Sequence, residues 1–331
     1  MTILVTGASG FLGRRLAEML SERGQALRLI LRSSSNFDAT GLERCEVVRC
    51  SLADNEALIR AMRGVRLVYN CAGLSSDWGR WADFRAANID GVANLLGAAR
   101  HVETVRRFVH VSTTDIYGYP EHPGDERQAF HDVGLPYNRS KGLGDRLVLD
   151  FQKTTGLPVT VVRPATIFGP RSKDWVVELS RHLKAGRALT VAGGRSAAGL
   201  VYVDDVAHAM MALAAIPAAA GEAYNVVDPH PITWREYFDI VADALDVPRP
   251  TLNVSQTTAW ALSHICETAY RILGMTSRPL FTRHVVFLLT RNQQYDSGKL
   301  TAAVRGFPEV GLLAGLERTM AWLKARYHEM S

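Results

Sequence analysis

Residues 2–13, TILVTGASGFLG, decide the fold of this chain. An apolar run at 3–5 precedes glycines at positions 7, 10 and 13, and apolar residues at helical spacing follow. In such a strand–turn–helix the first glycine permits the tight turn, the second lets the backbone approach a pyrophosphate, and the third lets the helix pack closely. The phosphates lie at a helix N-terminus, which favours negative charge. The stretch predicts a dinucleotide site formed by Gly7, Ser9, Gly10, Phe11, Leu12 and Gly13.

Strand-like and helix-like segments alternate through the first half of the chain. Strands are predicted at 2–6, 26–31, 46–49, 67–70, 107–111 and 159–162, and helices at 11–22, 56–62, 83–101 and 137–155. Such alternation is typical of a parallel sheet covered on both faces. Together with the glycine-rich first turn, it predicts an α/β fold built on a doubly wound parallel Rossmann sheet.

The regularity fades after about residue 164. Strands are predicted at 189–191, 199–203 and 223–227, and helices at 175–185, 206–215, 234–245, 257–273 and 313–327. The expected organisation is a dinucleotide-binding Rossmann domain at 1–164, with further core elements near 199–227. Residues 165–331 are expected to form a smaller, largely helical α/β substrate lobe over the crevice at the sheet's carboxyl edge.

Bulk composition is that of an ordinary globular enzyme. Of 331 residues, 47% are hydrophobic and 21% charged, and the net charge of +5 is spread without a Lys/Arg-rich block. A solvated basic surface is the expectation, with attraction to an anionic ligand or a lipid surface as the sharper alternative, and nucleic-acid binding is not expected. The glycine motif begins so early that no signal peptide is expected, and a cytoplasmic location is predicted. The four cysteines fit no metal or disulfide framework, so no metal is expected.

The end of the second strand bears on which dinucleotide binds. An acid there usually bonds the ribose 2′-hydroxyl of NAD, whereas Arg32 can pair with a 2′-phosphate. NADP(H) is therefore favoured and NAD(H) is the alternative, unless Arg32 is merely solvated. Small residues after the fourth strand, Cys71, Ala72 and Gly73, suit a loop that passes close under the cofactor.

A tyrosine and a lysine one helical turn apart, in YNRSK at 137–141, form the candidate catalytic pair. A phenol normally ionises near pH 10, and a neighbouring ammonium, with oxidised nicotinamide, should lower that pKa. Tyr137 would then exchange a proton near neutrality while a hydride moves, and Lys141 would also bond the nicotinamide ribose. Thr113 would hold the substrate oxygen, with Ser112 and Thr114 as competitors. Asn88 is either the holder of a relay water or a packing residue.

These segments resemble the extended short-chain dehydrogenase/reductase superfamily over nearly the whole chain. The matching stretches are TGASGFLG, AANIDGVANLL, VSTTDIYG, YNRSK, RPATIFGP, VYVDDVAHA and AYNVVD. The resemblance implies a catalytic triad of Thr113, Tyr137 and Lys141, beside a cofactor contact at Ser112. It also implies a wall beside the nicotinamide at Pro164 and Ile167, and an adenine pocket at Ser51 and Leu52, where the family more often has Asp-Leu.

Two positions differ from those of epimerases and dehydratases in the superfamily, and they argue against a nucleotide-sugar substrate. Ala198 stands where epimerases usually carry an arginine, and Thr114-Asp115 lacks one of the paired acids of dehydratases. The stretch at 257–300 resembles the 3β-hydroxysteroid dehydrogenase branch, including bacterial sterol dehydrogenases and 2-alkyl-3-oxoalkanoate reductases, whose helices roof a pocket for a large apolar substrate. Substrate contacts are expected from Trp78, Thr114, Asp115 and Tyr202.

The sequence therefore predicts an NAD(P)-dependent oxidoreductase. It would interconvert a secondary alcohol and a ketone on a bulky hydrophobic 3-hydroxy/3-oxo substrate: a sterol, a triterpenoid or a long β-keto acid. The alternatives are a nucleotide-sugar epimerase with bound NAD and a non-catalytic NADP(H) sensor.

Two kinds of partner are expected besides the small molecule. The apolar stripe on helix 257–273 packs in the core, lines a lipid pocket or rests on a membrane, so peripheral membrane contact through the 255–290 helices is one expectation. A homodimer through helices 83–101 and 137–155 is the other, and it rests on the resemblance.

Overall fold

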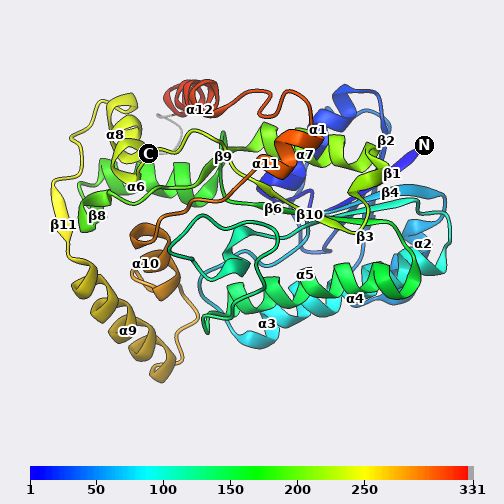
Figure 1. The fold of residues 1–331 in the computed structure, drawn as a ribbon, viewed down its shortest axis with the longest axis horizontal. Helices are drawn as coiled ribbons and strands as arrows, with labels where there is room; N and C mark the ends of the chain where they lie inside the picture. Colours follow the sequence, from blue (N-terminus) through cyan, green and yellow to red (C-terminus); the bar gives the residue numbers. More distant parts are fainter. Residues whose placement is uncertain (327–331) are drawn as a thin grey trace.

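The computed structural model describes residues 1–326, and a seven-stranded sheet lies at its centre (Figure 1). The strand order is β10-β6-β5-β4-β1-β2-β3, and every neighbouring pair in it is parallel. This order confirms the predicted doubly wound Rossmann sheet. The strands are β1 (Thr2–Thr6), β2 (Ala26–Leu31), β3 (Cys45–Arg49), β4 (Val65–Asn70), β5 (Arg107–Val111), β6 (Val159–Pro164) and β10 (Glu222–Val226).

Helices cover both faces of the sheet because its strands are apolar on both sides. On one face α1 packs beside α7, and on the other α2, α4 and α5 lie side by side (Figure 1). Each layer encloses its own apolar cluster, one containing Leu16 and Met210, the other Leu58, Leu95 and Val148. The helices are α1 (Phe11–Glu22), α2 (Asn55–Met62), α4 (Gly91–His101), α5 (Pro136–Thr155) and α7 (Val203–Ala215).

The prediction of one continuous helix at 83–101 is wrong. The structure divides it into α3 (Trp81–Arg85), a π-helical turn at Ala86–Asp90, and α4. A π-helical turn holds one residue more than an α-helical turn and is often found at functional sites. Asn88 lies in this turn and is 2% exposed.

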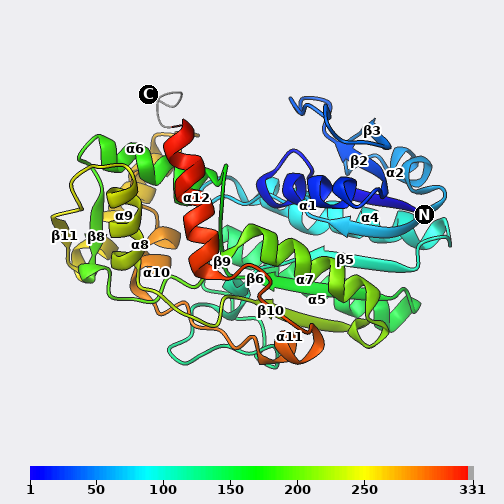
Figure 2. The ribbon, with the colours of Figure 1, turned by 90° about the horizontal axis from the view of Figure 1, so that it is seen from above.

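The rest of the chain forms a smaller lobe beside the carboxyl ends of the strands (Figure 2). Its strands pair in parallel two by two, β7 with β9 and β8 with β11. The strands are β7 (Thr166–Phe168), β8 (Leu189–Val191), β9 (Leu200–Tyr202) and β11 (Leu252–Val254). The helices are α6 (Leu179–Lys184), α8 (Trp234–Ala244), α9 (Gln256–Ile272), α10 (Arg283–Thr290) and α12 (Leu312–Arg326), while α11 (Gly298–Ala303) lies beside β10.

Four of these elements were not among the predicted ones: β7, β11, α10 and α11. The strand expected at 199–203 ends at Tyr202 because α7 begins at Val203. The last residue of the helix expected at 313–327 lies outside the described residues. Strand β10, which lies within the further core elements predicted near 199–227, adds the edge strand beside β6.

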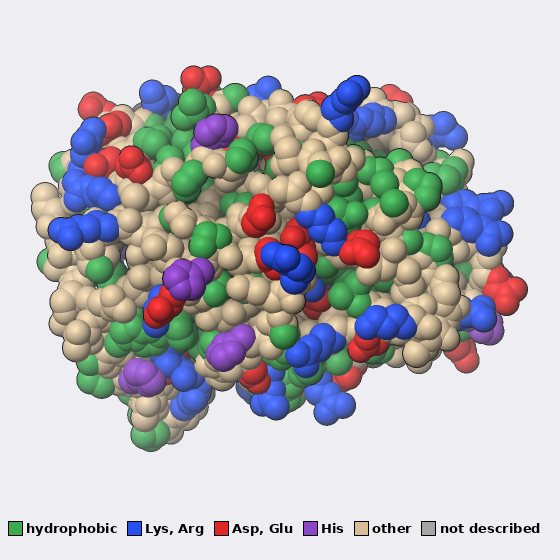
Figure 3. Space-filling model, in the orientation of Figure 1, with side chains coloured by type: hydrophobic (Ala, Val, Ile, Leu, Met, Phe, Trp, Pro, Cys, Tyr) green, Lys and Arg blue, Asp and Glu red, His purple; other side chains and the backbone are tan. Residues whose placement is uncertain are grey.

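Helix α9 corrects one expectation about packing. Its apolar stripe does not fill the core, because Ile265, Ile272 and Leu273 are 64%, 80% and 70% exposed. The residues that α9 buries are Ala259, Ser263 and Glu267. Figure 3 shows the resulting hydrophobic surface at the lower left of the molecule, where α9 lies. Within residues 1–326, no helix is long and apolar enough to cross a bilayer.

Candidate active site

The glycine turn at the end of β1 has no room for side chains. Gly7 has φ +70°, and a Cβ on it would lie 2.6 Å from the backbone of Cys71. A Cβ on Gly13 would lie 2.3 Å from the carbonyl oxygen of Gly7. Gly10 donates its N–H to the same carbonyl at 2.9 Å, which closes the turn. The turn therefore brings the start of α1 against the loop after β4.

The N-terminus of α1 is open to an anion. Its N-cap is Gly10, no side chain caps the first turn, and no acid lies there. Ser9 and Gly10 are exposed, Phe11 is half-buried, and Leu12 and Gly13 are buried. Free N–H groups on an exposed helix end, behind a turn without Cβ atoms, fit a dinucleotide pyrophosphate.

A buried polar chain supports the floor of this cleft. Thr6 Oγ1 donates to Asn70 Oδ1 at 2.6 Å and accepts from the N–H of Ala72 at 3.1 Å. Asn70 Nδ2 lies 3.0 Å from Nδ1 of the fully buried His110. These bonds lock the ends of β1, β4 and β5 together. They position the predicted loop Cys71–Ala72–Gly73, and burial raises the pKa of the Cys71 thiol to about 12.

The residues predicted to bind the adenosine half lie on the outer strands. Arg32 directly follows β2 and is exposed, and among the described residues its guanidinium has no bonded partner. Ser51 is exposed and accepts from the N–H of Ala53 at 3.1 Å, and Leu52 is half-buried against Gly91. Arg32 is thus free to meet an anion.

Tyr137, at the start of α5, lies near Thr113, whose hydroxyl acts to lower the pKa of the phenol. Ser75, which was not predicted, also lies near this phenol and acts to lower its pKa. The lowering of the phenol pKa was predicted for a site that holds oxidised nicotinamide, and it stays a prediction. Burial raises the pKa of Tyr137 well above its ordinary value, the Asp115 carboxylate adds to this effect, and the two hydroxyl contacts oppose it.

Lys141 lies one turn further along α5 and is 7% exposed. Its Nζ donates to the carbonyl oxygen of Val111 at 2.6 Å. Burial lowers the pKa of its ammonium to about 8, although nearby Asp145, Cys71 and Asp115 act in the opposite direction. The lysine is therefore held at the carboxyl end of β5, beside the loop at Gly73, whose Cβ position lies 3.9 Å from Nζ.

Asn88 anchors the loop after β4 to helix α5. Its Oδ1 accepts from the N–H of Leu74 at 2.8 Å, and its Nδ2 donates to Leu74 O at 3.1 Å and to Ser140 Oγ at 2.9 Å. This side chain is fully engaged in holding the backbone. These contacts fit the predicted packing role of Asn88. Its alternative role, holding a relay water, stays a prediction.

A histidine from the small lobe reaches the site, and sequence reasoning missed it. His284 on α10 places Nε2 2.9 Å from Asp115 Oδ2, and its ring centre lies 5.4 Å from that of Tyr137. His284 and Asp115 are 8% and 7% exposed. Asp115 is held in turn by Asn138, which donates to its carbonyl at 2.6 Å. No local motif marks His284, because it lies on a short helix 147 positions after Tyr137.

Other predicted residues take up varied positions. Pro164 ends β6 and is buried, Ile167 in β7 is half-buried, and Ser112 and Thr114 are buried beside Thr113. Trp78 meets Tyr270 of α9 edge to face, with ring centres 6.1 Å apart. Tyr202 packs into the core, where its ring would meet a Cβ on Gly315 at 2.7 Å. Substrate contact by Trp78, Thr114, Asp115 and Tyr202 stays a prediction.

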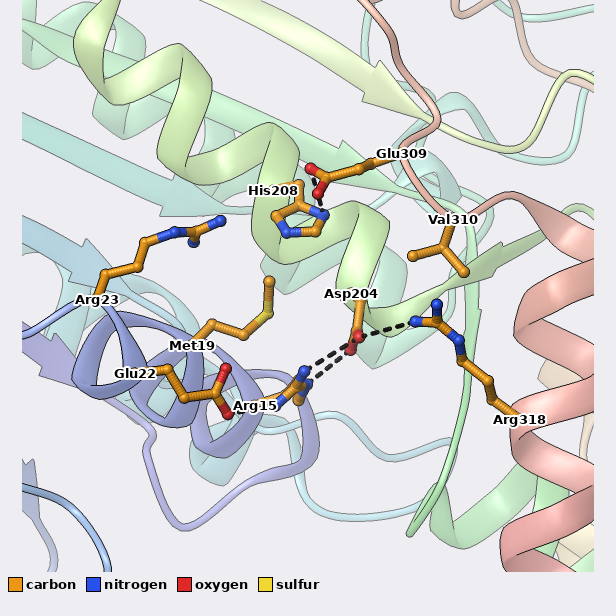
Figure 4. A pocket seen from close by; sticks show the side chains of 9 residues that line it. All are labelled: Arg15, Met19, Glu22, Arg23, Asp204, His208, Glu309, Val310 and Arg318. Atoms are coloured by element: carbon orange, nitrogen blue, oxygen red, sulfur yellow. Dashed lines mark hydrogen bonds and ion pairs between the residues drawn. The ribbon is translucent and has the colours of Figure 1, made fainter.

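One surface hollow of about 300 Å³ lies elsewhere (Figure 4). It is formed by α1, α7 and α12, and its charges are satisfied internally: Arg15 donates to Asp204 at 2.7 Å, and His208 pairs with Glu309 at 2.9 Å. None of the predicted site residues lines it. The hollow is therefore distinct from the predicted site at Tyr137. No cluster of three or more metal-binding side chains occurs in the part of the chain that the structure describes.

A glycine turn facing an open helix end, with a tyrosine, threonine and lysine at the neighbouring strand end, defines a dinucleotide-dependent enzyme. The chain belongs to the NAD dependent epimerase/dehydratase family, whose model matches residues 3–226. Members of this family use NAD(P), and the residues of the glycine turn would hold its pyrophosphate.

Individual relatives confirm the resemblance found in the motifs. The chain is similar to a 2-alkyl-3-oxoalkanoate reductase of Stenotrophomonas maltophilia, with 29% identity covering 97% of this chain and 99% of that protein. It is 27% identical to a 3beta-hydroxysteroid-dehydrogenase/decarboxylase of Arabidopsis thaliana, covering 96% of this chain and 61% of that one. A UDP-glucose 4-epimerase structure from Thermotoga maritima shares the fold, with TM-score 0.80 and 22% identity over 99% of this chain and all of that one.

Proposed function

We propose that this enzyme interconverts a ketone and a secondary alcohol on a bulky, apolar 3-oxo/3-hydroxy substrate. The observation that carries the proposal is the grouping of Thr113, Tyr137 and Lys141 at the carboxyl end of β5 and the start of α5. The names of the reductase and the hydroxysteroid dehydrogenase relatives support the substrate class: a sterol, a triterpenoid or a long β-keto acid. Buried Ala198, in place of a phosphate-binding arginine, speaks against a nucleotide sugar.

The side chains divide the chemistry among them. Thr113 and Tyr137 bind the substrate oxygen, and the Tyr137 phenol donates or accepts its proton. The raised phenol pKa keeps this proton on Tyr137 at neutral pH, which suits reduction of a carbonyl. A bound nicotinamide supplies or accepts the hydride. Lys141 bonds the ribose and places a positive charge near the phenol.

The exposed, unpaired Arg32 supports NADP(H) as the preferred cofactor, with NAD(H) as the alternative. Changing Arg32 to Glu places an acid where the 2′-phosphate would lie. We expect the ratio of kcat/KM for NADPH to that for NADH to fall at least about tenfold. An unchanged ratio in this variant would contradict the role of Arg32.

The proposed activity is tested with purified protein and both reduced cofactors. The substrates are 3-oxo sterols and long 3-oxo acids, compared with UDP-glucose, and Tyr137→Phe is the control. We expect turnover of an apolar ketone that falls by about 10²–10⁴-fold in the variant. Conversion of UDP-glucose alone would identify an epimerase, and cofactor binding without turnover would indicate a sensor.

We further propose that the α9–α10 hairpin, residues 256–291, rests on an anionic lipid surface. It carries exposed Leu262, Ile265, Ile272, Leu273, Met275 and Leu280. The hairpin contains four arginines and one acid, Glu267, which is 4% exposed and paired with Arg283. Arg278 and Arg291 pair with Asp77 and Glu121 outside the hairpin, so its own basic excess is partly offset. An apolar surface edged by arginines fits the acyl region of a lipid layer and its anionic headgroups. A homodimer through α4 and α5 would leave this hairpin free.

Sedimentation with vesicles tests this surface. We expect binding to phosphatidylglycerol vesicles, weaker binding to phosphatidylcholine, and at least a tenfold loss in the double variant Ile272→Ser, Leu273→Ser. Leu313→Ser, which removes a 75% exposed leucine from α12, is the matched control. Binding that is unchanged in the double variant would exclude the hairpin. A loss of dimers in light scattering would instead assign it to a second copy of the chain.

A further inference from the structure

The His284–Asp115 pair leaves one strong hydrogen-bonding atom unused beside the reacting groups. Nε2 of His284 is taken by Asp115 at 2.9 Å, whereas the buried Nδ1 has no hydrogen-bond partner among residues 1–326. Buried polar atoms are nearly always satisfied, so an open one in a site calls for a ligand. Nδ1 is buried, and a hydrogen bond from a buried atom to a charged group is strong because water does not weaken it. The rings of Tyr119 and Tyr137 lie beside the imidazole, with ring centres 6.2 and 5.4 Å from its own.

The carboxylate of Asp115 decides which ligand suits this nitrogen. Because Asp115 accepts from Nε2, that nitrogen carries a hydrogen, and protonation of Nδ1 makes the ring an imidazolium paired with a carboxylate. Such a pair is neutral as a whole. An imidazolium placed between two carboxylates gains a charge-assisted hydrogen bond to each.

We propose that His284 recognises a substrate carboxylate that is bonded to the carbon next to the reacting carbonyl carbon. The inference rests on the proposed function, and it narrows the substrate from bulky 3-oxo compounds in general to 3-oxo or 3-hydroxy acids. Tyr137 and Thr113 hold the oxygen at C3, while Nδ1–H of His284 donates to the acid group. Because α10 carries His284, the small lobe supplies the acid-binding group and the Rossmann lobe supplies the groups that bind the C3 oxygen.

Binding of 3-hydroxyhexadecanoic acid and of its amide, measured by calorimetry with NADP⁺ present, tests the proposal apart from turnover. The wild-type protein should bind the acid at least about tenfold more tightly than the amide. His284→Gln keeps a donor toward Asp115, because the glutamine Nε2 takes the place of the imidazole Nε2, but removes the second ring nitrogen. We expect this variant to lose the preference for the acid and to keep its affinity for the amide.

Asp115→Asn gives a second test that needs no change at His284. It keeps the shape of the side chain but removes the charge that favours the imidazolium, so the preference for the acid should fall at least about tenfold. A preference that persists in both variants, or is missing from the wild-type protein, would overturn the proposal. Reduction of 3-oxo sterols is assayed separately, so failure of the general activity is distinguishable from failure of acid recognition.

Discussion

At the scale of single residues, the burial of Lys141 costs folding free energy. Its ammonium is buried, and its pKa of about 8 lies below the ordinary value of 10.5. Between these two pH values the unfolded chain binds more protons than the folded chain, so the free energy of unfolding rises with pH. The cost of burying the ammonium is therefore complete below pH 8 and becomes smaller as the pH rises above 8. The site therefore gives up folding free energy to hold a charge where the chemistry needs it.

Lys141→Met should reveal this cost. Urea unfolding at pH 8 and at pH 10 gives the free energy of unfolding for both proteins. We expect the value for the wild type minus that for the variant to rise by about 2–3 kcal/mol over this interval. A difference that stays constant with pH would contradict the lowered pKa.

Gly13 is a residue whose missing side chain matters. In Gly13→Ala the new Cβ would lie 2.3 Å from the Gly7 carbonyl oxygen, so the turn must open. We expect a loss of stability of about 1–3 kcal/mol and cofactor binding weaker by tenfold or more, measured by urea unfolding and NADPH fluorescence titration. Gly97→Ala is the control, because that glycine also lies in a helix but has open space around it. It should gain up to about 1 kcal/mol.

The candidate catalytic residues differ in how easily the sequence reveals them. Tyr137 and Lys141 are four positions apart on one helix face, and Thr113 follows an apolar strand, so local patterns were enough to find them. Ser75 and His284 have no such pattern, since one lies in an irregular loop and the other reaches the site through the packing of α10. Burial and Asp115 raise the pKa of Tyr137, and neither influence can be read from the local sequence pattern.

At the scale of elements, a buried ion pair joins helix α5 to the sheet. Arg163 in β6 donates two hydrogen bonds to Asp145, at 2.9 and 2.8 Å, and the side chains are 6% and 2% exposed. Arg163 also donates to Tyr117 Oη at 2.9 Å, and that hydroxyl donates to Asn225 in β10 at 2.7 Å. This network fixes α5, and hence Tyr137, against two strands.

Removing one partner of this pair should be costly. Asp145→Ala leaves a buried guanidinium without its carboxylate, and we expect it to lower the free energy of unfolding by about 3–5 kcal/mol. Asp150→Ala, on the same helix, breaks an exposed pair with Lys153 and should change stability little. Urea unfolding of both variants gives the comparison, and equal effects would contradict a structural role for the buried pair.

Elements with strong periodicity were predicted with their observed bounds, as β1, β2, β5 and α1 show. The three-residue strands β7 and β11 are too short for any period to be recognised, and the eight residues of α10 give little more. The helix α9 was found, but its packing was not, because it buries Ser263 and Glu267 and exposes isoleucine. Tertiary contacts, which the local pattern does not contain, decided that face.

At the scale of the whole molecule, the chain returns to the Rossmann sheet after building the small lobe. Lys299 of α11 donates to the Ala223 carbonyl in β10 at 2.9 Å, and Asp205 of α7 accepts from the N–H groups of Val310 and Gly311. Because β10 pairs with β6 and α7 packs beside α1, residues before and after position 164 share one sheet and one core.

We expect this interleaving to make unfolding a single transition. Four of the six tryptophans, Trp175, Trp234, Trp260 and Trp322, lie beyond residue 164, so fluorescence reports mainly on that part, whereas far-ultraviolet circular dichroism reports on the whole chain. Their midpoints in urea should coincide. An earlier midpoint by fluorescence would show that the lobe unfolds independently.

The π-helical turn at Ala86–Asp90 has a consequence for how this gene can change over time. Each residue of a helix advances it by about 100° around its axis, so a one-codon deletion there would restore α-helix and rotate Trp81–Arg85 relative to Gly91–His101. It would also pull the Asn88 carbonyl away from Gly144, where a Cβ would lie only 2.3 Å from that oxygen. Point substitutions can accumulate along this helix, but a change in its length by one residue would dismantle the anchor of the active-site loop.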